Sequence, residues 1–157
     1  MKGSVTVRMA APREQVWDLV TDVTRIGEFS PETFEAEWLG GAAGPAVGAR
    51  FRGHVKRNGI GPVYWTTCEV ITCDRPSEFA FVVLAGRQIV NTWRYGIDPT
   101  SDDPGATDVT ESYELSGSPM LAAYRMVFGR WRDRTNRNGM RATLARIKAA
   151  VETAPTV

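Results

Sequence analysis

The sequence predicts an α+β fold in which a curved antiparallel sheet wraps around one long C-terminal helix. Six strand-like segments follow one another between residues 35 and 115, and turn residues separate them. Strands joined by short turns pair as antiparallel hairpins. Residues 119–152 form a continuous helical run, because no proline occurs between Pro119 and Pro155. This run is the only element long enough to cover the apolar face of such a sheet.

The first 34 residues predict one strand and two short helices. Residues 4–9 alternate between polar and apolar side chains, which is typical of a strand. Pro12 suits the first turn of a helix, and Glu14 supplies the acidic residue favoured there. Residues 24–34 form a second, shorter helical piece. The expected order is therefore one strand, two helices, six strands and one long helix.

Turn chemistry divides the middle of the chain into six further strands. They are predicted at residues 35–39, 50–57, 63–73, 78–84, 88–97 and 107–115. Small residues fill the segment 40–48, and Asn58 with Gly59 opens a turn. Residues 99–105 form a polar connector between the last two strands.

The final helix presents an apolar stripe that we expect to face the sheet. Its members recur three and four positions apart, which places them on one helix face. They are Leu121, Tyr124, Phe128, Trp131 and Thr135, followed by Leu144, Ile147 and Val151. We expect a single domain over residues 1–153 and a frayed tail over residues 154–157.

The charge balance and the cysteines limit the possible partners and location. The chain has 157 residues, with 19 basic and 18 acidic side chains and a formal net charge of +1. We therefore expect neither nucleic acid nor an anionic membrane surface as a partner. No apolar run approaches the roughly 20 residues of a transmembrane helix, and the N-terminus lacks a signal-peptide core. Cys68 and Cys73 should point to opposite faces of one strand without forming a disulfide, which favours a reducing, cytoplasmic location.

Eight stretches of the chain carry a resemblance to a known family. They are PREQVWDLVTDVTR at 12–25, FSPE at 29–32, EWLGG at 37–41, VGARF at 47–51, WTTCEV at 65–70, FAF at 79–81, TWRY at 92–95 and TDVTES at 107–112. Together they resemble the SRPBCC (START-like) superfamily and, within it, the polyketide cyclase/dehydrase-like family of small bacterial proteins.

The resemblance implies a helix-grip fold, as in START domains and pollen allergens, with a hydrophobic cavity between the sheet and the C-terminal helix. Related proteins include aromatase/cyclases, lipid-transfer domains and pollen allergens that bind flavonoids. No universal catalytic motif accompanies this fold, so the family name does not transfer an activity. The sequence departs from the family at Val55, two residues after Gly53, where relatives often carry an asparagine. Any ligand contact made by that asparagine is absent here.

Strand alternation and the helical stripe together select the side chains that we expect to face this cavity. The predicted ligand-binding residues are Phe51, Gly53, Val55, Thr66, Cys68, Phe81, Trp93, Tyr95, Glu111, Tyr113, Tyr124, Phe128, Trp131 and Thr135. The inward face of the strand 63–73 stays open, because its two faces are similar in character. An aromatic wall of this kind suits a flat apolar ligand.

Glu111 is the strongest candidate for a catalytic residue, and Tyr113, on the same face of the strand, is the second candidate. A carboxyl group among apolar side chains has its pKa raised by desolvation unless a partner offsets this effect. Such an acid could exchange protons with a substrate or anchor a ligand hydroxyl. Alternatively, Glu111 makes a structural hydrogen bond to Tyr95, Tyr113 or a helix arginine. The catalytic residues are therefore unknown at this stage, and whether the protein is an enzyme stays open.

No metal or other cofactor is expected. His54 is the sole histidine, and it alternates with Arg52 and Lys56 on the predicted outer face of the sheet. A zinc site or a serine-hydrolase triad would need more histidine or cysteine ligands, or a nucleophile beside this histidine. The arginines at 130, 132, 134, 137 and 141 spread around the final helix, which indicates a solvated surface. One of them could still lie at the cavity opening and meet an anionic ligand group.

Three functions remain open from the sequence. The first is a protein that binds a hydrophobic small molecule, such as a lipid, an aromatic compound or a polyketide-like compound. The second is a polyketide aromatase/cyclase or dehydrase that uses an inward Glu and Tyr for acid–base help. The third is a protein-interaction or antitoxin-like module. The partner expected is an apolar small molecule, and the chain is a monomer or a homodimer.

Overall fold

The elements of the chain follow the predicted order. A computed structural model describes residues 1–57, 61–117 and 119–154, and the side chains of these residues other than 119–125 and 127–130. The elements are β1 (Lys2–Met9), α1 (Arg13–Thr21), the 3-10 helix η1 (Val23–Arg25), α2 (Ile26–Phe29), β2 (Thr33–Trp38), β3 (Arg50–Lys56), β4 (Val63–Asp74), β5 (Glu78–Ala85), β6 (Gln88–Pro99), β7 (Thr107–Leu115) and α3 (Pro119–Thr153). The predicted turn at Asn58 and Gly59 lies outside the described residues.

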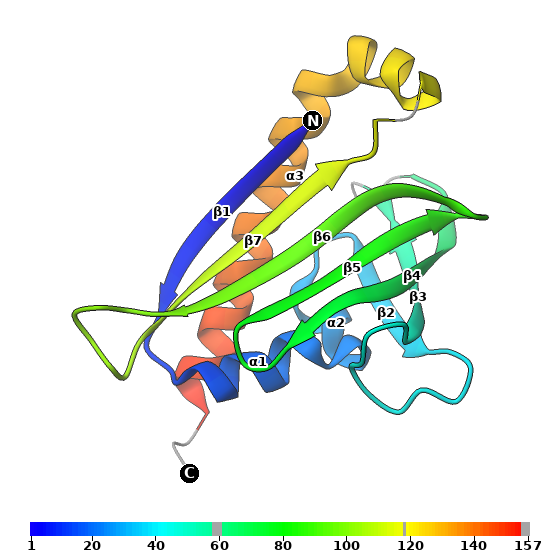
Figure 1. Cartoon of the computed structure of the whole chain (residues 1–157). Coiled ribbons are helices and arrows are strands. Elements are labelled where there is room, and N and C mark those ends of the chain that lie inside the picture. Colours follow the sequence, from blue (N-terminus) through cyan, green and yellow to red (C-terminus); the bar gives the residue numbers. More distant parts are fainter. Residues whose placement is uncertain (58–60, 118, 155–157) are drawn as a thin grey trace.

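The strands form one curved antiparallel sheet, as predicted. Its order is β1-β7-β6-β5-β4-β3-β2, so each strand from β2 to β6 pairs with the next strand along the chain. The first strand, β1, closes one edge by pairing with β7. Helices α1 and α2 carry the chain from this edge to β2 at the opposite edge (Figure 1).

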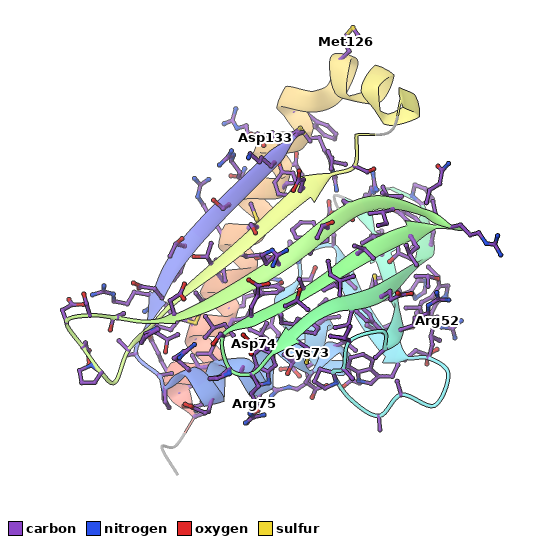
Figure 2. The ribbon with its side chains drawn as sticks, viewed as in Figure 1. Arg52, Cys73, Asp74, Arg75, Met126 and Asp133 are labelled. Atoms are coloured by element: carbon purple, nitrogen blue, oxygen red, sulfur yellow. The ribbon has the colours of Figure 1, made fainter. Side chains whose placement is uncertain are left out.

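The long helix α3 lies against the sheet over only part of its length. Its first turns project beyond the sheet, and the remainder runs along β1 and β7 toward α1 (Figure 1). Met126 marks the projecting part (Figure 2), where its side chain is 86% exposed. Among the described residues, no helix combines the length and apolarity that crossing a membrane requires.

The hydrophobic core lies where α1 meets the C-terminal half of α3. Leu144, Ile147 and Val151 are buried there, in one cluster with side chains from α1 and the sheet. Trp17 of α1 contacts Phe79 of β5 edge to face, with ring centroids 6.3 Å apart. Each such side chain stabilises the fold by about 1.5–3 kcal/mol through removal of apolar surface from water.

A β-bulge in β4 corrects the prediction for the two cysteines. Val70 pairs with Phe81 and Cys73 with Phe79, and the register shifts between Val70 and Thr72. The extra residue reverses the alternation of faces, so Cys73 packs against the same core that holds Cys68. The prediction of opposite faces is therefore wrong. Both cysteines are free thiols.

Candidate functional site

A cavity of about 560 Å³ lies between the sheet and α3. Its floor is the inner face of β3 to β7, and α3 with the segment from α2 to β2 forms the other walls. The residues that line it are Ile26, Ser30, Pro31, Glu32, Thr33, Phe51, Gly53, Val55, Arg57, Tyr64, Thr66, Cys68, Phe81, Val83, Asn91, Trp93, Tyr95, Glu111, Arg132, Thr135, Asn136, Asn138, Gly139, Met140, Ala142 and Thr143. Its size is that of a typical small-molecule site.

Burial along the lining separates a deep end from an outer end. Phe51, Cys68 and Met140 are at most 3% exposed. Arg57 and Tyr64, on either side of the β3–β4 connection, are more exposed. The cavity is therefore closed near the core and approaches solvent at this hairpin.

The segment from α2 to β2 is fixed by several hydrogen bonds. The Ser30 hydroxyl accepts from the backbone N–H of Thr33 at 2.9 Å, which caps the start of β2. The carbonyl of Glu32 accepts from the N–H of Lys56 at 2.8 Å, and Arg146 of α3 donates to the carbonyl of Phe29 at 3.2 Å. These bonds hold the segment between β3 and α3, so it is a defined wall of the cavity.

Most of the side chains selected from strand alternation lie on the cavity wall. They are Phe51, Gly53, Val55, Thr66, Cys68, Phe81, Trp93, Tyr95 and Glu111, together with Thr135 from α3. In β4 the lining face carries Tyr64, Thr66 and Cys68. Val55 brings a methyl surface to the position where relatives often carry an asparagine.

Tyr113 and Trp131 require correction, because neither is among the lining residues. The hydroxyl of Tyr113 donates to the carboxylate of Asp133 where α3 crosses β7, so the helix covers this tyrosine. Asp133 lies near the N-terminal end of β1 (Figure 2). Trp131 is 57% exposed. Tyr124 and Phe128, the other two predicted aromatic residues, have side chains outside the described residues.

The face that α3 turns toward the cavity is offset from the predicted stripe. Arg132, Asn136, Gly139 and Thr143 line the cavity at the same spacing of three and four. A shift of one residue rotates a helix face by about 100°, which carries Trp131 out of the cavity. A search for apolar stripes misses these four residues because they are polar or small.

Arg132 is buried at the cavity wall, which contradicts the expectation of a solvated arginine. It is 9% exposed, and its Nη1 and Nη2 atoms donate to the two carboxylate oxygens of Glu32 at 3.3 and 3.2 Å. This bidentate pair joins α3 to the segment before β2 and cancels the charge of both groups. It leaves no free cation at this point of the wall.

Glu111 and Tyr95 form a polar pair within the apolar deep end. The two residues lie opposite each other on β7 and β6, and the Tyr95 hydroxyl donates to Glu111 Oε1 at 2.9 Å. Burial raises the pKa of Glu111 to about 8, although the hydrogen bond from Tyr95 lowers it. Burial also raises the pKa of Tyr95, and the neighbouring Glu111 raises it further. At neutral pH Glu111 is therefore mainly a neutral carboxylic acid.

Two lining atoms are buried without a hydrogen-bond partner among the described residues. They are Oε2 of Glu111 and Oδ1 of Asn91. Asn91 lies on β6 two residues from Trp93, on the same inward face. Most buried polar atoms in proteins have a partner, so these two need an explanation.

Metal-ligating side chains do not cluster at the cavity among the residues that the structure describes. Within the described ranges, no three His, Cys, Asp or Glu side chains come close enough to share an ion. Burial raises the pKa of the Cys68 thiol to about 12, so it stays protonated and unreactive at neutral pH. His54 lies on the outer face of the sheet, stacked on Trp65 with ring centroids 4.2 Å apart.

Comparison with protein families identifies the chain. The family profile described as polyketide cyclase / dehydrase and lipid transport matches residues 1–152. The chain belongs to this family. The match spans nearly the whole sequence, and it confirms the resemblance carried by the eight motifs.

Solved structures place the polyketide cyclase/dehydrase family member in the helix-grip fold. A START superfamily protein from Mycobacterium smegmatis is 17% identical, with a TM-score of 0.74, over 96% of this chain and 97% of that one. A polyketide-cyclase-like protein from Corynebacterium glutamicum is 29% identical, with a TM-score of 0.52, over 97% and 85% of the two chains.

The di-domain ARO/CYC BexL from the BE-7585A biosynthetic pathway is 18% identical, with a TM-score of 0.69. It is matched over 99% of this chain but over only 51% of its own, so the present family member corresponds to about half of BexL. Among curated proteins, none matches the sequence.

Proposed function

We propose that the protein binds a hydrophobic small molecule in the cavity between the sheet and α3. The observation that carries the proposal is the cavity of about 560 Å³, whose deep wall consists of buried aromatic and aliphatic side chains. Pockets of this size and character bind apolar molecules because ligand and wall both leave water. Membership of a family described by polyketide chemistry and lipid transport supports this proposal.

A cavity-filling variant tests the proposal. Ala142 lines the cavity, whereas Ala145 is exposed on the same helix. We expect the purified wild type and Ala145→Phe to carry a co-purified small molecule in native mass spectrometry and to bind an environment-sensitive naphthalene dye. Ala142→Phe should lose both signals while keeping its circular dichroism spectrum. Equal dye binding by the two variants would remove the cavity as the binding site.

A second candidate function, acid–base catalysis on a polyketide-like substrate, is favoured by one observation. Burial raises the pKa of Glu111 to about 8, which suits proton exchange near neutral pH, and its Oε2 is buried without a partner among the described residues. Aldol cyclisation or dehydration needs mainly positioning and modest acid–base help. Incubation with a poly-β-ketone mimic tests this: Glu111→Gln should retain binding but lose turnover. Equal product formation by both proteins would exclude Glu111 from chemistry.

A further inference from the structure

The unpartnered polar atoms of the cavity wall indicate which polar groups a bound ligand would carry. Oε2 of Glu111 and Oδ1 of Asn91 are buried, and no described residue bonds to either. An unsatisfied buried polar atom destabilises the folded protein, and native proteins retain few of them. Both residues line the same cavity. Polar groups of a bound ligand would satisfy both atoms.

The spacing of these two points follows from the sheet register. Every second residue of β6 points to the inner face, so the cavity wall carries Asn91, Trp93 and Tyr95. Tyr95 pairs directly with Glu111 on β7. Asn91 and Tyr95 are four residue steps apart along β6, so their Cα atoms lie about 13 Å apart at 3.3 Å per residue. Trp93 lies between them and gives the intervening wall an aromatic surface.

The two points differ in hydrogen-bonding character. Oε1 of Glu111 accepts from Tyr95, so the acid proton on Oε2 is available to donate to a ligand oxygen. Oδ1 of Asn91 is an amide oxygen and accepts from a ligand hydroxyl or N–H. Of the two arginines that line the cavity, Arg132 is paired with Glu32 and Arg57 lies at the outer end, so the wall near Glu111 presents no unpaired cation among the described residues. An anionic group would therefore be buried there without a counter-charge.

We infer that the ligand is an elongated and largely apolar molecule, with an uncharged oxygen acceptor at the Glu111 end and a hydroxyl or N–H donor at the Asn91 end, about 13 Å farther along the strand direction. This inference rests on the proposed function and specifies its ligand. The acceptor lies at the deep end against Glu111, the donor bonds to Asn91, and an aromatic or unsaturated middle lies along Trp93.

Three rigid rods of similar length test the inference. They are trans-stilbene, the stilbene diphenol with one hydroxyl at each far end, and the stilbene with a carboxylate at one far end. We expect the diphenol to bind about tenfold more tightly than stilbene in a fluorescence titration at pH 7, since each new hydrogen bond adds up to about tenfold. The carboxylate should bind more weakly than the diphenol, because it donates no hydrogen bond to Asn91 and its charge has no partner beside Glu111.

Variants assign the effect to the two atoms. Asn91→Leu and Glu111→Leu should each lower the ratio of diphenol affinity to stilbene affinity about threefold. Thr92→Val alters a polar side chain on the opposite face of β6 and serves as the control, with unchanged affinity for both rods. Because the two Leu variants are independent, failure of one to fold leaves the other informative.

Three outcomes would overturn the inference. Equal affinities for diphenol and stilbene, or tightest binding of the carboxylate, would show that the two atoms do not select the ligand, while the proposed apolar cavity would stand. Failure of all three rods to bind would also reject this ligand class. The dye and co-purification experiments with Ala142→Phe then decide separately whether the cavity binds any ligand.

Discussion

The two halves of the space between α3 and the sheet are filled in opposite ways. Toward the C-terminus, Leu144, Ile147 and Val151 are large, apolar and buried against α1 and the sheet. One to three turns earlier, the helix turns Arg132, Asn136 and Gly139 toward the sheet, and a cavity lies between them. A single helix thus supports a packed core with one half and bounds a binding space with the other. Side-chain volume and polarity, and not helix position alone, set the boundary.

The largest expected effect is that of pH on the free energy of unfolding, through Glu111 in the cavity half. Burial gives Glu111 a pKa of about 8 in the folded state, against its ordinary value of 4.5 in the unfolded chain. Between these values the unfolded state releases the proton and the folded state keeps it, so stability falls as pH rises. Each pH unit in this window costs about 1.4 kcal/mol, or several kcal/mol in all. Above pH 8 the contribution levels off.

The Glu111→Gln variant isolates this contribution, because the amide stays neutral at every pH. Urea unfolding at pH 5 should give similar free energies for the two proteins, and at pH 8.5 the variant should be the more stable one. Parallel stability curves for wild type and variant across this range would contradict a buried, protonated Glu111.

The second effect concerns the core half. Leu144→Ala removes a fully buried side chain and leaves a void against α1, so the free energy of unfolding should fall by about 3 kcal/mol. Thr135→Ala, on the cavity half of the same helix, should change it by less than about 1 kcal/mol, because Thr135 is only half-buried and borders the cavity. Urea denaturation measures both values. Similar losses for the two variants would mean that the cavity half is packed as tightly as the core.

The same contrast explains what the sequence predicts well and what it misses. Strand alternation shows which residues share a face, and apolar character selects the inner one; this places Tyr95 and Glu111 on the cavity wall together with Phe51 and Phe81. On α3 the apolar stripe is right for Leu144, Ile147 and Val151, which are buried, but wrong for Trp131. The helix face toward the cavity carries small and polar residues such as Gly139, which apolar character does not select. Long-range pairing is also invisible to local patterns. The burial of Arg132 depends on Glu32, 100 positions away.

The smallest expected change in the free energy of unfolding comes from replacing a glycine of the cavity wall, and a second glycine serves as its comparison. A Cβ at Gly139 would lie 3.7 Å from Pro31 Cγ, an ordinary contact across the cavity wall. Since alanine is the better helix former, Gly139→Ala should raise the free energy of unfolding by up to about 1 kcal/mol.

Gly27→Ala is the matched control, because its Cβ would lie 2.0 Å from the carbonyl oxygen of Phe34, where α2 passes β2. The backbone would have to move, at a cost of about 1–3 kcal/mol or more. Thermal unfolding of both variants measures the difference. If Gly27→Ala proved more stable than the wild type, the close contact between α2 and β2 would be refuted. If Gly139→Ala proved less stable, the wall at Pro31 would have no room for one methyl group, which contradicts a cavity there.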